Sequence, residues 1–137
     1  MVDSTVALAP RADIYSVVEQ MSRTSKGIFP AEFELVVLLA LARLRHEAYG
    51  VTVRREIEER GGRPVSIGAV YATLARLAEK GFVESELSEP VAVRGGRSRR
   101  YYHLTPAGEK VLARSLAMLD RMAEGLERLR PAEQGAE

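Results

Sequence analysis

Apolar residues recur at helical spacing along most of the chain. Residues 31–45 are apolar around nearly the whole helical circumference, which predicts a buried central helix. Residues 51–60 place Val53 and Ile57 on one inward face, and residues 66–80 carry another apolar stripe. Three helices joined by short turns predict a helix-turn-helix domain.

The third of these helices has clear boundary signals. Ser66 can cap its N-terminus, and Gly81 can take the left-handed conformation that ends it. Gly61 and Gly62 end the preceding helix. The predicted inward stripe of the third helix consists of Ile67, Val70, Leu74, Leu77 and Ala78.

After the third helix, the pattern changes to short segments typical of β-strands. They cover residues 82–87, 91–93 and 99–104, and Gly95 and Gly96 form the obvious turn between them. A short hairpin that follows a helix-turn-helix is the arrangement of a wing. The expected fold class is therefore mainly α with a small β-hairpin wing, a winged helix-turn-helix.

A long C-terminal helix is predicted over residues 105–130. Thr105 is a suitable N-cap, and Pro106 suits the first helical position. Apolar residues then alternate four and three positions apart, which is typical of a seam that packs against a partner helix. A helix of about 24 residues, with a rise of roughly 1.5 Å each, is too long for the shorter helices of its own domain to cover. We therefore expect its seam to pack against a second copy of the chain in a homodimer. Packing of the seam on its own domain is the alternative. The seam consists of Leu112, Leu116, Leu119, Met122, Ala123, Leu126 and Leu129.

Length and composition bound the class of protein. The 137 residues suffice for one ordinary domain with a modest extension. The 20 basic and 19 acidic residues nearly balance, so the net charge of +1 does not itself point to nucleic acid, membrane or an acidic substrate. The absence of cysteine excludes disulfides and thiolate metal sites and fits a reducing cytoplasm. The longest apolar run, Leu35–Ala42, is far too short to cross a bilayer, so we expect a soluble cytoplasmic protein without a cofactor.

The exposed side of the third helix has the chemistry of a DNA recognition helix. With the apolar stripe inward, Gly68 and Ala69 would allow close approach to a major groove, and Ala72 could touch a thymine methyl group. Arg76 could reach a guanine edge or a phosphate. On the flanks lie Tyr71, whose hydroxyl could donate to a phosphate, and Thr73. The alternatives are a tight helix crossing for the glycine and an ordinary core role for the tyrosine.

Four arginines surround the expected hairpin turn. Arg94, Arg97, Arg99 and Arg100 flank the two glycines with no acidic residue among them. Such a hairpin projects cations toward a minor groove or along the DNA backbone. A run of charges is often only a solvated face, but its place beside a helix-turn-helix favours double-stranded DNA as the partner.

Three sequence segments together resemble the PadR family of bacterial transcriptional regulators. They are AYG (48–50), SIGAVYATLARLAEKGFV (66–83) and GRSRRYYHLTPAGE (96–109), and the resemblance spans about residues 31–130. It implies a homodimeric winged helix-turn-helix protein that binds an operator, usually represses, and often releases DNA when a small molecule binds near the dimer interface. Ser66, Tyr71 and the hairpin arginines match positions expected to touch DNA, and Lys26 resembles a basic residue placed against the backbone.

The chain accordingly divides into four parts. These are an N-terminal extension with an accessory helix (1–29), a winged helix-turn-helix DNA-binding domain (30–104), a dimerisation helix (105–130) and a disordered tail (131–137).

Other classes of function find less support in the sequence. An enzyme would need a nucleophile with its base, a metal cluster or a phosphate loop, whereas His46 and His103 are isolated. A winged-helix protein-interaction module without specific DNA recognition is the stronger rival, but it would not need a cationic hairpin. A ligand sensor would line its pocket with aromatic residues. The candidates are Tyr15, Phe29, Phe33 and Tyr49.

Overall fold

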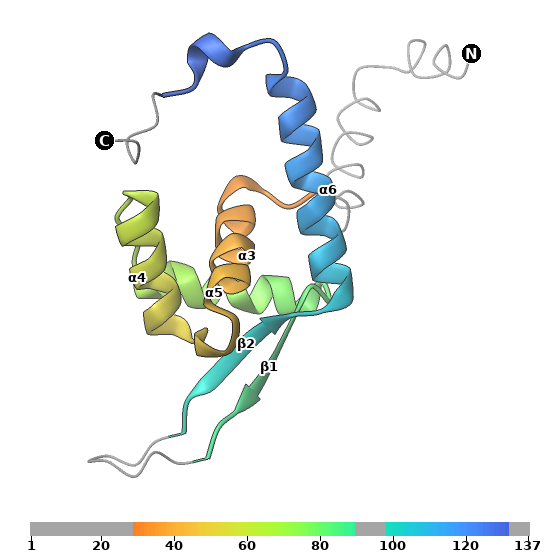
Figure 1. The fold of residues 1–137 in the computed structure, drawn as a ribbon. Helices are drawn as coiled ribbons and strands as arrows, with labels where there is room; N and C mark the ends of the chain where they lie inside the picture. The colour runs from red at the N-terminus through yellow and green to blue at the C-terminus, as the bar shows by residue number, and fades with distance from the viewer. Residues whose placement is uncertain (1–28, 90–97, 132–137) are drawn as a thin grey trace, which may run out of the picture.

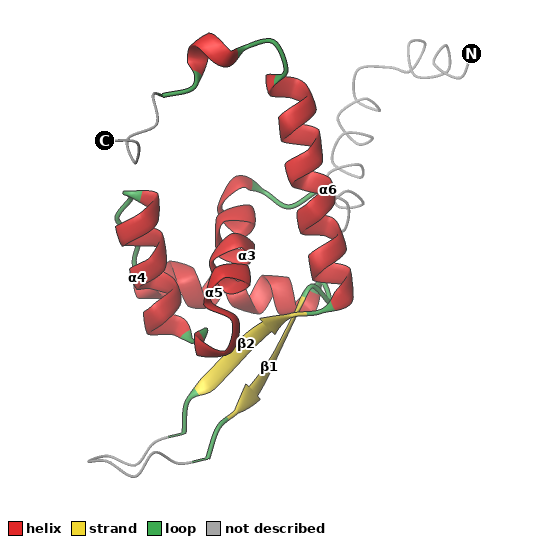
Figure 2. Ribbon diagram, in the orientation of Figure 1, coloured by secondary structure: helices red, strands yellow, loops and turns green. Residues whose placement is uncertain are grey.

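The computed structural model describes residues 29–89 and 98–131 of the chain (Figure 1). These residues are mainly helical, with one antiparallel strand pair that projects from the helices (Figure 2). The predicted fold class is confirmed. The helices are α3 (Glu32–Leu44), α4 (Gly50–Gly61), α5 (Ile67–Glu79) and α6 (Pro106–Ala123), with short 3-10 turns at Arg45–Glu47 and Glu127–Leu129; the strands are β1 (Val83–Leu87) and β2 (Arg100–Leu104).

Helix α3 forms the centre of the core, between α4 and α6, with α5 crossing behind it (Figure 1). Its Val37, Leu38 and Leu41 are buried, as the nearly continuous apolar circumference predicts. Val53 and Ile57 of α4 are buried against this core, which confirms their predicted inward position. Full burial of each such side chain contributes about 1.5–3 kcal/mol. The other buried apolar residues are Ala40, Ala48, Val70, Leu74, Leu77, Phe82, Val83, Val111 and Leu112.

The predicted helix caps are confirmed. Ser66 Oγ accepts a hydrogen bond from the Ala69 N–H at 3.0 Å and begins α5. Thr105 Oγ1 accepts from the Gly108 N–H at 3.0 Å and donates to the Gly81 carbonyl at 2.7 Å. Thr105 therefore joins the start of α6 to the end of α5, and this fixes where the strand pair leaves the helices.

The strand pair runs in the expected register of a hairpin. Val83 lies opposite Leu104, and Leu87 lies opposite Arg100. The Tyr102 N–H also donates to the Ala48 carbonyl at 2.9 Å, which ties β2 to the turn before α4. The strand predicted at residues 91–93 lies outside the described residues, as do the predicted accessory helix and nearly all of the predicted tail.

The long C-terminal helix is shorter than predicted. Helix α6 ends at Ala123, and Gly125 follows with a φ of +84°, a left-handed conformation that breaks the helix. Leu126 and Leu129 therefore lie beyond α6, and the prediction of one helix to residue 130 is wrong.

The apolar seam also differs from the prediction at its start. Leu112 is only 7% exposed and belongs to the core of its own domain, so its prediction as a dimerisation residue is wrong. Leu116, Leu119 and Met122 remain exposed on α6, and Ala123 is half-buried at its end. None of the helices in residues 29–89 and 98–131 is long and apolar enough to cross a membrane.

Candidate nucleic-acid interface

The exposed face of α5 carries mostly small side chains. Gly68, Ala72 and Ala75 follow one another along its middle, and Glu79 ends the row. Residues three and four positions apart share one face of a helix, so this row forms a continuous front. Gly68 and Ala72 lie where the sequence placed them, whereas Ala69 is half-buried at the edge of this front.

Ala75 and Glu79 were missed because the inward stripe was wrongly assigned. Ala78 is exposed, contrary to the prediction, and Thr73 takes its place in the buried stripe. This exchange rotates the exposed face toward Ala75 and Glu79. The sequence pattern distinguishes these two positions only weakly, because an alanine and a threonine differ little in hydrophobicity. Tertiary packing decides which of the two is buried.

Thr73 cannot contact DNA directly from its position. It is 1% exposed, and its Oγ1 accepts a hydrogen bond from Arg76 Nη2 at 3.1 Å. Its prediction as a DNA-contacting residue on an exposed flank is therefore wrong. The hydroxyl instead holds the Arg76 guanidinium along the helix.

Tyr71 lies at the other edge of the α5 front and is exposed. Its ring packs over Gly50, the first residue of α4, where the Cβ of any larger residue would overlap Tyr71 Cζ and Oη. This contact joins the AYG segment (48–50) to the predicted recognition helix. Burial raises the pKa of Tyr102 on β2. The charge of Arg100 lowers this pKa and the interaction with Tyr71 raises it, and the net result is an increase. The Tyr102 phenol therefore remains a neutral hydrogen-bond donor at physiological pH.

The base of the hairpin is built from aromatic and cationic side chains. The Arg99 guanidinium carbon lies 4.5 Å from the centroid of the Tyr49 ring, and the rings of Tyr49 and Tyr101 meet edge to face at 5.3 Å. Hydrogen bonding to the Tyr101 side chain is the main cause of a raised pKa of Arg99. Arg100 Nη1 donates to Ser85 Oγ on β1 at 2.9 Å. Both arginines thus begin from defined positions at the start of β2.

The remaining predicted cations, Lys26, Arg94 and Arg97, lie outside the described residues. Among the other predicted DNA-contacting residues, Ser66 caps α5, five lie on this helix and two lie at the start of the second hairpin strand; the five are Gly68, Ala69, Tyr71, Ala72 and Arg76, and the two are Arg99 and Arg100.

Lys80 has a different role from the one its position suggests. A lysine at the end of a helix usually stabilises the helix dipole, but the Lys80 Nζ donates to both carboxylate oxygens of Glu34, at 2.9 and 2.8 Å. Glu34 is buried and also accepts from the Ala31 N–H at 3.0 Å. Burial alone would raise the pKa of Glu34, but the Lys80 and Ala31 hydrogen bonds and the charges of Lys80 and Arg76 together lower it. Residues 34 and 80 are far apart in sequence, and no local pattern indicates this pairing.

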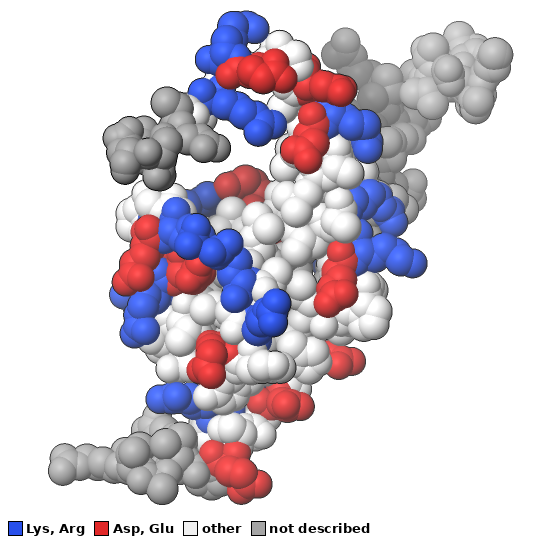
Figure 3. Space-filling view, in the orientation of Figure 1, with Lys and Arg blue, Asp and Glu red and all other residues white. Residues whose placement is uncertain are grey.

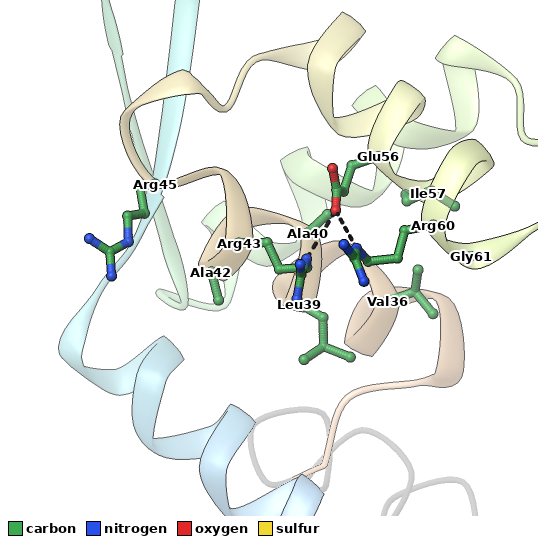
Figure 4. Close-up of a pocket in the computed structure, with 10 residues that line it drawn as sticks. All are labelled: Val36, Leu39, Ala40, Ala42, Arg43, Arg45, Glu56, Ile57, Arg60 and Gly61. Atoms are coloured by element: carbon green, nitrogen blue, oxygen red, sulfur yellow. Dashed lines mark hydrogen bonds and ion pairs between the residues drawn. The ribbon is translucent and has the colours of Figure 1, made fainter. Parts of the chain in front are cut away.

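A hollow of about 640 Å³ lies between α3 and α4 (Figure 4). At the edge of this hollow, Glu56 Oε2 forms ion pairs with Arg43 Nε at 3.0 Å and with Arg60 Nε at 3.1 Å. The apolar side chains of Val36 and Leu39 form part of the lining of the hollow. Phe29, Phe33 and Tyr49 do not line this hollow. Basic and acidic side chains are interspersed on this face of the molecule (Figure 3).

Comparison with known proteins decides the family. The model of the transcriptional regulator PadR-like family matches residues 37–114, more than half of the chain. The chain belongs to the PadR-like family of transcriptional regulators. The sequence resemblance is thereby confirmed, and the PadR-like protein is a DNA-binding regulator of transcription by family.

Individual relatives agree with this assignment. The transcriptional regulator Rv3488 of Mycobacterium tuberculosis (strain H37Rv) is 37% identical over 78 residues, which make up 57% of this chain and 68% of that protein. A PadR family regulator from Clostridium difficile R20291 has the same fold, with a TM-score of 0.61 at 20% identity over 72% of this chain and 97% of that one. A PadR-like regulator from Bacillus cereus has a TM-score of 0.58 at 22% identity over 81% and 99% of the two chains. The family and these relatives are transcriptional regulators, not enzymes.

Proposed function

We propose that this PadR-like regulator binds operator DNA as a homodimer and acts as a repressor, with α5 in the major groove and the hairpin arginines along the backbone. The observation that supports the placement of α5 is its front of Gly68, Ala72 and Ala75, flanked by Tyr71 and Arg76. Small side chains allow a helix to approach base edges closely.

The flanking groups supply contacts to phosphate. Ser66 Oγ accepts the Ala69 N–H, so its own hydroxyl proton remains available to a phosphate oxygen at the N-terminus of α5. That terminus also favours an anion through the helix dipole. Tyr71 donates from the opposite edge. Lys26, Arg94, Arg97, Arg99 and Arg100 complete the proposed set of backbone contacts.

We assign dimerisation to the exposed apolar residues after the start of α6. Leu119 is 45% exposed and Met122 is 70% exposed, and Leu116 continues the same stripe. Large apolar side chains exposed together are the usual mark of an interface. Ala123, Leu126 and Leu129 extend this proposed surface, so residues 105–130 act as the dimerisation segment beside the DNA-binding domain of residues 30–104.

Selection of binding sites from genomic fragments tests this function. We expect the wild-type protein to enrich a site with two related half-sites about 34 Å apart, as a symmetric dimer requires. One phosphate contact for each of the four hairpin arginines in each subunit would give a slope of log affinity against log salt on the order of −7. The variant A72E, which places a carboxylate on the α5 front, should lose the site. Binding without any preferred site, equal in wild type and A72E, would contradict the proposed recognition.

A further inference from the structure

A buried carboxylate lies between the C-terminal half of α5 and the start of α3. Glu34 is the anion, and Arg76 and Lys80 are the two cations that face it. We call these three residues the Glu34 cluster. It contains one more positive charge than negative, so one cation is available for another anion.

The two cations hold Glu34 very differently. Lys80 is 14% exposed and bonds to both carboxylate oxygens, at 2.9 and 2.8 Å. Arg76 is 54% exposed, and its Nε lies 3.6 Å from Glu34 Oε2, beyond a good hydrogen bond. Its direct hydrogen bond is to Thr73 Oγ1. Arg76 can therefore leave the cluster while Lys80 and the Ala31 N–H continue to satisfy the buried carboxylate.

The position of Arg76 places this loosely held cation at the edge of the proposed DNA-binding front. Ala72 lies one helical turn before it, and Glu79, which is also exposed, lies three residues after it. An arginine side chain that swings away from Glu34 moves from the α3 side of α5 toward that front. A phosphate can accept a direct hydrogen bond from the guanidinium, which is stronger than the ion pair that Arg76 makes with Glu34 at 3.6 Å.

We infer that Arg76 exchanges Glu34 for a backbone phosphate when the protein binds DNA, and that Glu34 is the positioning residue that holds Arg76 in the free protein. This inference rests on the proposed placement of α5 on DNA. The exchange has a cost in affinity. Weak contacts with arbitrary DNA must compete with Glu34 for Arg76, so the carboxylate lowers the affinity for nonspecific duplex.

A double-mutant cycle with E34Q and R76Q tests the exchange. Glutamine keeps one oxygen that can accept from Lys80 and from the Ala31 N–H, so E34Q removes the charge at the loss of only the second Lys80 hydrogen bond. Binding is measured by fluorescence anisotropy with a random-sequence duplex over a series of salt concentrations. We expect E34Q to bind this duplex about two- to fivefold more tightly than wild type, the range for releasing one partly exposed ion pair. In the R76Q background, the same E34Q substitution should change the affinity by much less.

The salt dependence separates exchange from a static pair. If Arg76 moves to a phosphate, R76Q should reduce the steepness of the log-log salt slope by about 0.9 per subunit. An unchanged slope in R76Q would mean that Arg76 stays with Glu34 and would overturn the exchange. Equal effects of E34Q in both backgrounds would also overturn it, because Glu34 would then act without Arg76. A loss in R76Q confined to certain base sequences would assign Arg76 to a base edge instead and likewise overturn it.

The variant E56Q is the matched control. Glu56 also bridges two cations, Arg43 and Arg60, and E56Q changes the net charge by the same amount. The hollow beside Glu56 is lined by α3, Arg45 and α4 and contains no residue of α5 (Figure 4). We expect E56Q to show only the small gain in affinity that follows from net charge, with no dependence on Arg76. A gain as large as that of E34Q would overturn the role of Glu34.

A measurement on the wild-type protein keeps the test decisive if E34Q does not fold. The Arg76 Nε–H resonance is followed by ¹⁵N NMR as duplex is added. Exchange predicts a shift of this resonance on binding, and an Arg76 resonance that stays unchanged in the complex overturns the inference. Failure of the wild-type protein to bind any duplex would instead overturn the proposed function, and the exchange with it.

Discussion

The end of the Tyr71 ring occupies the place that a Cβ at Gly50 would take, so there is no room for a side chain between them. Gly50 is the first residue of α4 and Tyr71 lies in the first half of α5, so this contact joins the two helices through the end of an exposed side chain. A substitution at residue 50 must therefore move Tyr71 or separate the helices.

We predict that Gly50→Ala displaces the exposed Tyr71 ring and destabilises the protein by about 1 kcal/mol, the low end of the cost of inserting a methyl group into a packed site. Urea denaturation measures this change. Gly61→Ala is the matched control at the other end of α4, where the nearest atom to an added Cβ is Ile57 Cγ2 at 3.9 Å. That variant should stay within about 0.5 kcal/mol of wild type. Equal stability of the two variants would contradict the packing of Tyr71 on Gly50.

The Glu34 cluster predicts a pH dependence of stability. The pKa of Glu34 is lower in the folded protein than its ordinary value of 4.5, so its stabilising effect is fully present above pH 4.5. It is lost as the pH falls below this value and through the folded pKa. Thermal denaturation of wild type and E34Q between about pH 3 and 7 should therefore show their difference in stability diminishing toward acid. A difference that stays constant with pH would argue against an ionised Glu34.

Lys80 should be the main stabilising partner of the buried Glu34 carboxylate. Lys80→Met keeps much of the side-chain volume but leaves the buried carboxylate with only the more distant Arg76 as a cation. We expect a loss of about 3 kcal/mol, typical of one partner removed from a buried pair. Lys110→Met removes an exposed lysine from α6 and serves as the control. Similar melting temperatures for the two variants would show that Lys80 contributes only at the surface.

The hairpin arginines should contribute to affinity without contributing to sequence preference. We predict that Arg99→Ala with Arg100→Ala weakens binding to all duplexes alike and reduces the salt slope by about 1.8 per subunit. Arg114→Ala with Arg121→Ala removes the same charge from α6, which leads away from the hairpin (Figure 1). That control should change the slope little. Unchanged operator affinity in the Arg99 and Arg100 double variant would contradict the proposed role of the hairpin.

The proposed dimer surface can be tested by charge insertion. Leu119→Glu puts a carboxylate into the exposed apolar stripe of α6, whereas Ala117→Glu puts the same charge on the opposite side of that helix. Because a buried unpaired charge is costly, we expect Leu119→Glu to sediment as a monomer and Ala117→Glu as a dimer. A monomeric wild-type protein at micromolar concentration would contradict the proposed assembly itself.

Much of the fold could be predicted because its signals are local. The caps at Ser66 and Thr105 depend on residues three positions away, and the helical and strand periods of the apolar residues set the order of elements. The motifs around residues 48–50, 66–83 and 96–109 were sufficient to indicate the family that the comparison then confirmed.

The sequence alone therefore determined the kinds of element, most of their boundaries and the small-residue character of α5. Tertiary packing decided that Thr73 is buried while Ala78 is exposed, that Leu112 belongs to the core, and that Glu34 receives Lys80 from 46 residues away. It also placed Tyr71 on Gly50. The physical reason is distance along the chain: local periodicity states which residues share a face, but contacts between elements depend on how those faces are rotated against one another.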